Sequence, residues 1–437
     1  MITNLRPFQI FLLVSFLFLA LLSLILLRGF SPNTSAENNP YGPRVVIWGP
    51  FPFNDVEDVL QQITDEEEAF GVVDYVFVSK EQFADRFLNA IAEGNAPDLV
   101  MLPHTELVSQ RSKLLPIPYD TDGFSTRNIR DRYVDGAEIF ALQNGLYAVP
   151  YVVDPLVLYW NRDLFAGAGL SGPPRSWEQL VGEAVGALTV RDNSRTILQS
   201  ALAFGEFRNV RNATAVLSLL MMQSGSTLVT ETDRGYEVAL NESLVGGRPP
   251  LEAALQFYTD FANASNPLYS WNRAQAEDRQ AFIAGDVAMY FGFASEAAMI
   301  QDRNPNLNFD VAPVPQGSSA TVARTYGNFY GLAIPRASRN PQGAFVAART
   351  LASAQNSLNM AVAVGYTPVH RAALTAGTSD AYAAVGYEAA LVARGWLQPD
   401  SASTDTAFQS MVEDVNSARS RVGSAASDAI NRLIMAY

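Results

Sequence analysis

The chain has 437 residues, with 44 acidic against 30 basic side chains and a formal net charge of −14. Such an acidic surface repels phosphate backbones, which argues against a nucleic acid partner. The absence of Cys excludes disulfides, zinc–thiolate sites, thiol nucleophiles and iron–sulfur clusters. Neither lysine, Lys80 or Lys113, follows a Gly, which excludes a P-loop. The two histidines, His104 and His370, lie far apart in the sequence, so we expect no metal and no cofactor.

The N-terminal segment predicts a membrane helix. Residues 8–27 carry no charge, and a helix of this length spans roughly 30 Å of bilayer. We expect a signal-anchor transmembrane helix over residues 1–30, followed by a flexible stalk over 31–43 that is rich in Pro, Asn, Ser and Gly. The alternative is a signal that is cleaved, because Thr34-Ser35-Ala36 offers small residues at a suitable spacing.

The folded part begins with alternating strands and helices. Three buried strands are expected, at residues 44–48, 72–78 and 99–102. The segments between them carry apolar residues at helical spacing, and a β-α-β-α-β order predicts parallel strands covered by helices. In such sheets ligands bind beyond the carboxyl ends of the strands, here near Trp48, Ser79 and His104.

Later segments suggest a second lobe. Asn144-Gly145 predicts a hairpin turn. The extended segment 148–161 is interrupted by Pro150 and Pro155 and suits a crossing between lobes, while Ser176 begins a capping box. Further helices are expected at 213–223 and 251–262, and further strands at 198–204, 287–291, 309–314 and 330–334. The chain is too long for one ordinary core, so we expect two large α/β lobes.

Aromatic residues at polar, Gly- and Pro-rich strand ends indicate a binding site. A rigid ring stacks on the C–H face of a sugar, and neighbouring Asp, Glu or Asn side chains bind its hydroxyl groups. Each ring could instead be a core residue with its polar tip satisfied. The ligand-binding candidates are Trp48, His104, Tyr151, Asp154, Trp271, Phe293, Glu296, Tyr326 and Asn328.

No catalytic motif accompanies these candidates. The sequence lacks a Gly-x-Ser-x-Gly nucleophile elbow and a His-Glu-x-x-His zinc motif. Asp120-Thr121-Asp122-Gly123 fails the spacing of a calcium loop, so we interpret it as a turn. A carboxylate pair for glycoside hydrolysis stays open, because nothing singles out one pair among the 44 acids. We expect a binding protein rather than an enzyme.

The order of the motifs resembles the extracellular solute-binding proteins of family 1, the maltose-binding-protein-like receptors of bacterial ABC importers. The block from Gly145 to Leu180 is the most specific part of the resemblance, and the order of the blocks adds more than any one of them. The other matching blocks are VVIWGPF, APDLVMLP, QAFIAGDVAMYFGFASE, VAPVPQG, YGNFYGLAIPRASRNPQGAFVAARTLAS and GYTPVH.

The resemblance implies a periplasmic-binding-protein-like fold, in which two α/β lobes joined by hinge strands close on a ligand. The N-lobe would combine residues 44–150 with 291–330, and the C-lobe 151–290 with 331–437. The chain would cross between the lobes near Pro150 to Asp154, return near Tyr290 and cross again near Tyr330 to Pro335.

The function implied by the resemblance is that of an extracytoplasmic receptor. It would capture a mono- or oligosaccharide between the lobes and deliver it, as a monomer, to the permease subunits of an ABC transporter. In organisms without a periplasm, many members of this family are tethered to the membrane through a lipid-modified Cys. This chain has no Cys, so the N-terminal helix would hold it at the membrane. The alternatives are a polyamine, polyol or peptide ligand in the same fold, or a membrane-anchored carbohydrate-active enzyme.

Overall fold

The structure is a computed structural model that describes residues 39–437 except 195, 226–227 and 241–246. The expected membrane helix over residues 1–30 and most of the expected stalk lie outside the described residues. Within the described part of the chain, no helix combines the length and the apolar character that a bilayer crossing requires.

The folded part begins earlier than we predicted. Tyr41 is fully buried, and its ring packs edge-on against Phe70 with the centroids 5.5 Å apart. Its hydroxyl lies 2.8 Å from Thr350 Oγ1. The expectation of a flexible stalk up to residue 43 is therefore wrong at Tyr41, because this aromatic ring is part of the folded core.

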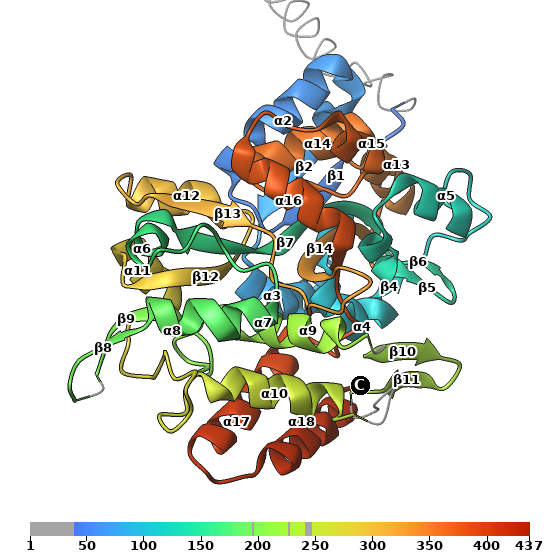
Figure 1. The fold of residues 1–437 in the computed structure, drawn as a ribbon. Helices are drawn as coiled ribbons and strands as arrows, with labels where there is room; N and C mark the ends of the chain where they lie inside the picture. Colours follow the sequence, from blue (N-terminus) through green and yellow to red (C-terminus); the bar gives the residue numbers. More distant parts are fainter. Residues whose placement is uncertain (1–38, 195, 226–227, 241–246) are drawn as a thin grey trace, which may run out of the picture.

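The described residues form a mixed α/β structure (Figure 1). The strands are β1 (Val45–Gly49), β2 (Val73–Phe77), β3 (Leu99–Pro103), β4 (Leu114–Leu115), β5 (Ala141–Leu142), β6 (Gly145–Leu146), β7 (Val149–Asn161), β8 (Val190–Arg191), β9 (Ile197–Leu202), β10 (Val229–Thr232), β11 (Gly235–Val238), β12 (Val287–Phe293), β13 (Phe309–Ala312), β14 (Thr325–Pro335), β15 (Thr367–Pro368) and β16 (Ala393–Arg394). The helices are α2 (Phe53–Glu66), α3 (Lys80–Ala92), α4 (Leu107–Gln110), α5 (Thr126–Arg132), α6 (Arg162–Gly167), α7 (Trp177–Gln179), α8 (Val185–Leu188), α9 (Ala213–Gln223), α10 (Pro250–Asp260), α11 (Asp278–Ala284), α12 (Glu296–Arg303), α13 (Pro341–Leu351), α14 (Ala354–Ala363), α15 (Arg371–Ala376), α16 (Ala381–Val392), α17 (Ser401–Asn416) and α18 (Val422–Ala436).

The first three strands form the parallel unit that the sequence predicts. β1 lies between β2 and β3 and is parallel to both. The helix α2 connects β1 to β2, and α3 connects β2 to β3. In α2, Val56, Val59 and Ile63 recur at helical spacing and are buried on one face. The predicted β-α-β-α-β arrangement is confirmed.

The long strand β7 belongs to two halves of the sheet. Its first half pairs with β14, where Phe329 lies opposite Val153. Its second half pairs with β12, where Gly292 lies opposite Val157. Pro155 stands between the two halves and has no N–H to donate to a neighbouring strand. The predicted role of this proline-interrupted segment as a crossing is confirmed by its two sets of partners.

The buried apolar residues form two clusters, which we call the N-lobe and the C-lobe. The N-lobe core takes residues from 41–153 and from 329–393. The C-lobe core takes residues from 156–326 and from 389–433. Figure 1 shows the N-lobe helices α2, α14 and α16 above the C-lobe helices α9, α10 and α17.

The core packing differs from the lobe division that the resemblance implied. Phe309 and Val311 pack in the C-lobe because β13 pairs with the second half of β7. Leu332 and Ala333 pack in the N-lobe because β14 pairs with β3. The expected assignments of residues 291–330 and 331–437 are therefore exchanged over most of their length.

The crossings between the lobes also differ from the expected ones. Tyr290 packs in the C-lobe core, so the chain does not return there. β14 makes the return crossing, with Tyr326 in the C-lobe core and Phe329 in the N-lobe core. A third crossing lies at the start of the C-terminal helices, between Ala393 of the N-lobe and Trp396 of the C-lobe.

Candidate ligand-binding cleft

A cavity of about 600 Å³ lies between the two lobes. Its N-lobe wall comes from the start of α3 and from the chain that follows β3, and its C-lobe wall comes from the starts of α9 and α17. The strand β14 and the end of β12 also line it. The lining residues are Lys80, Glu81, Ala84, Pro103, Thr105, Glu106, Phe207, Arg208, Val210, Arg211, Asn212, Thr214, Ala215, Phe293, Tyr326, Asn328, Tyr330, Gln398, Ser401, Ala402 and Asp405.

The side chains of β14 line the cleft in alternation. Tyr326, Asn328 and Tyr330 all face the cavity, as residues two apart on one strand must. The opposite face of the strand is packed, because a Cβ on Gly327 would lie 3.0 Å from the Cβ of Ala393. Asn328 is partly exposed at the cavity, and the rings of Tyr326 and Tyr330 on either side of it are almost fully buried, at 3% and 2% exposure.

Helix starts contribute hydroxyl and carboxylate groups to the cleft. Thr214 Oγ1 donates to Asp405 Oδ1 over 2.6 Å, which joins the starts of α9 and α17. Ser401 Oγ lies 2.9 Å from Thr105 Oγ1, which joins α17 to the N-lobe. Burial raises the pKa of the Asp405 carboxyl. These groups are held in place before any ligand arrives.

The charges around the cleft are balanced. Three acidic and three basic side chains line it, namely Glu81, Glu106, Asp405, Lys80, Arg208 and Arg211. The Lys80 ammonium lies 5.2 Å from the centroid of the Tyr330 ring and donates to the Tyr366 hydroxyl over 3.2 Å. Two of the basic groups pair with carboxylates outside the lining, Arg208 with Glu413 over 2.7 Å and Arg211 with Glu277 over 3.6 Å.

Among the predicted site residues, the structure brings Phe293, Tyr326 and Asn328 together at this cleft. The ring centroids of Phe293 and Tyr326 lie 6.3 Å apart. The remaining candidates do not line the cavity.

Three of the aromatic residues predicted to bind ligand are instead buried in the core of a lobe. Trp48 is 8% exposed and lies under the Arg86 guanidinium, 5.3 Å from the ring centroid. Tyr151 has no exposed surface. Trp271 is buried in the C-lobe, where its indole N–H donates to Asn209 Oδ1 over 3.2 Å. At these three positions the alternative interpretation, a packed core aromatic, agrees with the structure.

His104 lies behind β14 rather than in the cleft. It is fully buried, and its Nδ1 accepts a hydrogen bond from the Phe329 N–H over 3.2 Å. Burial lowers the pKa of the imidazole to about 3, so the ring is neutral. Its ring lies 5.9 Å from that of Tyr326, so it supports a residue that does line the cleft.

Asp154 and Glu296 form hydrogen bonds within the protein that connect the strands and the helix next to the cleft. Asp154 accepts hydrogen bonds from the Ser295 N–H and hydroxyl over 3.0 and 2.6 Å, which attach β7 to the start of α12. Burial raises the pKa of its carboxyl to about 7. Glu296 accepts from the Tyr290 hydroxyl and the Phe293 N–H over 2.8 and 2.9 Å. Both carboxylates are occupied by protein donors.

Three residues at the starts of helices line the cleft but are not among the predicted ligand contacts. Lys80, Thr214 and Ser401 each occupy the first turn of a helix or the position at its start, and no local pattern marks them as ligand contacts. For Lys80 a signal existed, because Ser79 lies at the carboxyl end of the second strand, where a ligand is expected.

A second contact joins the lobes outside the hinge strands. The hairpin β10–β11 of the C-lobe lies beside α4 and β5–β6 of the N-lobe (Figure 1). Arg111 Nη2 lies 2.5 Å from Glu231 Oε1, and its Nη1 donates to the Tyr236 hydroxyl over 3.2 Å. The Gln143 N–H donates to Glu231 Oε2 over 2.8 Å. We call these four residues the interlobe clasp.

Comparison with known proteins places the chain in a family. The sequence model of the family described as "bacterial extracellular solute-binding protein" matches residues 55–357. A relative from Deinococcus radiodurans named "Probable ABC transporter-binding protein" is 25% identical over 228 residues, 51% of each chain. The chain thus spans about half the length of the curated relatives it matches.

Solved structures share the fold. A cyclo/maltodextrin-binding protein complexed with maltotetraose has a TM-score of 0.70 at 17% identity, over 90% of this chain and 97% of that one. An ABC transporter solute-binding protein of Thermotoga lettingae bound with α-D-tagatose has a TM-score of 0.67 at 19% identity, over 90% and 100%. At these identities the similarity shows the two-lobed fold alone. Together with the family match over most of the chain, it confirms the resemblance, and the chain belongs to the bacterial extracellular solute-binding protein family.

Proposed function

We propose that the chain is the solute receptor of an ABC importer and that it captures a neutral carbohydrate in the interlobe cleft. The observation that carries the proposal is the β14 face, where two tyrosines flank an amide in a cavity with balanced charges. Aromatic rings stack on sugar C–H faces, and amide and hydroxyl groups bind sugar hydroxyls. Two solved structures with this fold contain carbohydrates, maltotetraose in one and α-D-tagatose in the other, which supports a carbohydrate as the ligand.

The mechanism we propose is closure around the ligand. The lobes are joined by three crossings, and a ligand that contacts both walls favours the arrangement in which those walls approach each other. The permease of an importer would then accept the solute from the closed form. No covalent step is required, so we propose a binding protein without catalytic activity. The family supports an extracytoplasmic location, and we propose attachment to the membrane through the N-terminal segment.

A polyamine receptor is the less favoured alternative. Polyamine recognition needs free carboxylates around the ligand, and two of the three acids of this cleft already accept hydrogen bonds, Glu106 from Ser109 and Asp405 from Thr214. Asp154 and Glu296, which would otherwise suit ammonium groups, are already bound to protein donors.

The test is a thermal-shift screen of the full-length chain against sugars, polyols, polyamines, amino acids and short peptides. A ligand that binds only the folded state raises the free energy of unfolding, by ~2.7 kcal/mol at a concentration 100 times its dissociation constant, and the melting temperature rises with it. We expect an oligosaccharide or monosaccharide to give the shift and to be recovered intact. A shift with cationic ligands alone would replace the carbohydrate with a polyamine, and cleavage of the sugar would show an enzyme.

A further inference from the structure

We propose that the N-lobe holds a second binding site, specific for a phosphate group, in a cavity that the proposed carbohydrate site does not use. The cavity has a volume of about 270 Å³, and only N-lobe elements line it. They are the end of α5, the start of β7, the junction of α13 with α14, and the start of α15. Since each water molecule takes ~30 Å³ of the liquid, a phosphate group fits there with several waters.

Two guanidinium groups line this cavity without a carboxylate to neutralise them. Arg132 comes from α5 and Arg349 from the last turn of α13. Among the described residues, neither forms an ion pair within 4.0 Å, whereas their neighbours Arg127, Arg130 and Arg371 all do. In an acidic protein, two unpaired arginines around one cavity leave a local positive charge that an anion would neutralise.

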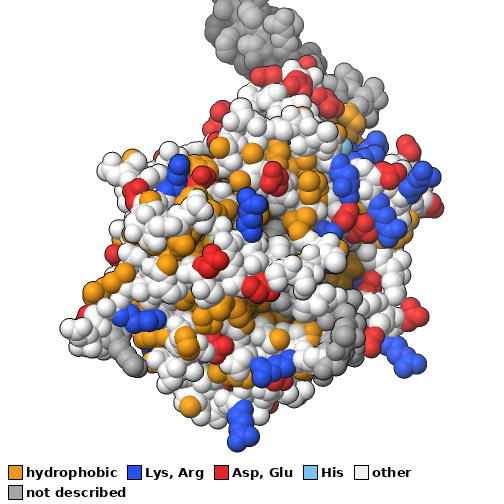
Figure 2. Space-filling model, viewed as in Figure 1, with side chains coloured by type: hydrophobic (Ala, Val, Ile, Leu, Met, Phe, Trp, Pro, Cys, Tyr) orange, Lys and Arg blue, Asp and Glu red, His pale blue; other side chains and the backbone are white. Residues whose placement is uncertain are grey.

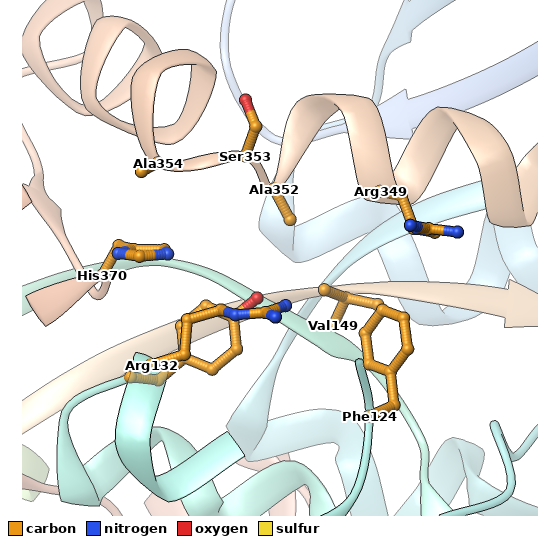
Figure 3. Close-up of a pocket in the computed structure, with 9 residues that line it drawn as sticks. Phe124, Arg132, Val149, Arg349, Ala352, Ser353, Ala354 and His370 are labelled. Atoms are coloured by element: carbon orange, nitrogen blue, oxygen red, sulfur yellow. The ribbon is translucent and has the colours of Figure 1, made fainter. Parts of the chain in front are cut away.

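A third polar group in the cavity lining also has a nitrogen without a partner among the described residues. The Nδ1 atom of His370 is buried, and no described atom forms a hydrogen bond with it. Buried polar nitrogens are rarely left unpaired, because an unmade hydrogen bond costs free energy. Figure 3 shows Arg132 extending between His370 and Val149, with Arg349 and the α13–α14 junction on the other side. An oxyanion beside the Arg132 guanidinium would lie between His370 and the exposed Arg349, which stand on opposite sides of the cavity.

The start of α14 adds to the site. Ser353 and Ala354 line the cavity, and α14 runs from there for ten residues. The first N–H groups of a helix favour negative charge, although in α14 the Asn356 N–H already donates to the Ser353 hydroxyl over 3.2 Å. Donors from α5, α13, α14 and the start of α15 therefore surround the cavity, and the several oxygens of a phosphate group can meet them together. Planar guanidinium groups are well suited to such oxygens.

The surface around the cavity carries both signs of charge. Figure 2 shows Lys and Arg side chains at the upper right, where Figure 1 draws α5 and α15, with Asp and Glu side chains among them. Arg127, Arg130 and Arg371 pair with Asp131, Glu138 and Asp135. The charge available to an anion therefore comes from Arg132 and Arg349. The phosphate group could belong to a free phosphate or to the headgroup of an anionic phospholipid.

The test measures phosphate binding by calorimetry with the full-length chain at constant ionic strength. We expect inorganic phosphate to saturate one site, and Arg132→Gln and Arg349→Gln each to weaken it at least ~10-fold, as the loss of a charge-assisted hydrogen bond predicts. Arg127→Gln is the matched control, because Arg127 lies on the same helix, is 89% exposed and pairs with Asp131. Arg132→Lys keeps the charge and should retain part of the binding if the glutamine variant misfolds.

The two histidines give a site-resolved signal. With ¹³C-labelled histidine, phosphate should shift the resonance of His370 and leave that of His104, which is buried behind β14, unchanged. A short-chain phosphatidylglycerol, used below its micelle concentration, separates the two sources. If the phosphatidylglycerol binds more tightly than inorganic phosphate and Arg132→Gln abolishes its binding, the site is assigned to a lipid headgroup. If it binds no more tightly, the site is assigned to free phosphate.

Three results would overturn the proposal. One is the absence of saturable binding of both probes. Another is an equal loss of affinity in Arg127→Gln, which would show a diffuse surface attraction. The third is binding without a shift at His370. None of these results depends on the carbohydrate site, because the cavity lies within one lobe.

Discussion

Arg111 of the N-lobe and Glu231 of the C-lobe form an ion pair 2.5 Å long, and their side chains are only 23% and 9% exposed. The pair joins the lobes at a place that neither β7 nor β14 reaches. The same arginine lies 5.2 Å from the centroid of the Tyr147 ring. An ion pair so far removed from water, with further donors around it, couples the positions of the two lobes.

A double-mutant cycle tests this coupling. Removal of one partner leaves the other charge poorly solvated, so Arg111→Gln and Glu231→Gln should each lower the free energy of unfolding by about 1–3 kcal/mol. The double variant should lose less than the sum of the two, as chemical denaturation would show. Arg44 and Asp74 form the control pair, since both are exposed and their coupling should fall below ~1 kcal/mol. Equal coupling energies for the two pairs would contradict the claim that the Arg111–Glu231 ion pair couples the lobes.

The buried hydroxyl of Tyr151 should be dispensable. Among the described residues it has no hydrogen-bond partner, although it is fully buried. Tyr151→Phe removes a desolvated polar atom and should leave the protein as stable or more stable, by up to about 1 kcal/mol. Tyr159→Phe is the matched comparison, because the Tyr159 hydroxyl donates to the Phe293 carbonyl over 2.7 Å, and it should cost about 1 kcal/mol. A greater loss in Tyr151→Phe than in Tyr159→Phe would contradict this interpretation.

The pKa of Asp154 predicts a pH dependence of stability. Burial raises its pKa from 3.8 to about 7, so the folded state binds more protons than the unfolded state between these values. Stability from this group is therefore present at low pH and is lost as pH rises toward 7, by up to ~1.4 kcal/mol per pH unit. The Asp154→Asn variant should lack this slope, so the difference in stability between variant and wild type should change steadily from pH 5 to 7 when both are measured by denaturation. Parallel curves would show that Asp154 titrates normally.

His104 should matter for the fold rather than for direct ligand contact. Its Nδ1 accepts from the Phe329 N–H, and its ring fills the space beneath Gly395, whose Cβ would lie 2.5 Å from Nε2. His104→Ala should lower the free energy of unfolding by about 2–4 kcal/mol, through a cavity and an unsatisfied N–H. Ligand affinity should change less than in variants of the cleft lining. Retained stability with lost affinity would restore the original prediction of a ligand contact.

Local sequence signals predicted much of the fold. Ser176 caps its helix as predicted, since its hydroxyl accepts from the Gln179 N–H over 3.1 Å, but the reciprocal bond of a capping box is shifted by one residue, because Gln179 Oε1 accepts from the Arg175 N–H. The Asn144-Gly145 turn connects β5 and β6, and Gly145 has a positive φ of 139°. The predicted helix over 213–223 matches α9. These features depend on contacts between near neighbours, which is why sequence patterns reveal them.

The site was harder to predict because its contacts are distant in sequence. Trp271 resembles a loop aromatic, and its partner Asn209 lies 62 residues away. Trp48 is followed by Gly and Pro, yet α3 covers it with Arg86. The Gly-containing, aromatic segment around residues 326–330 predicts Tyr326 and Asn328 as ligand contacts, although the expected strand begins only at residue 330 and β14 begins at Thr325. Thr214 and Ser401 could not be found, because only the packing of α9 and α17 turns their helix starts toward the cleft.

The most direct measurement is calorimetric titration of the best sugar from the screen into the wild type and three variants. Phe293→Ala and Asn328→Ala change partly exposed cleft residues, and each should raise the Kd about fivefold or more, as the loss of about 1 kcal/mol predicts. Asn359→Ala changes a partly exposed asparagine on α14, outside the cleft lining, and should leave the Kd unchanged. One-site binding that only the two cleft variants weaken is the result we predict. Sugar binding with the same Kd in all four proteins would contradict the interlobe cleft as the carbohydrate site.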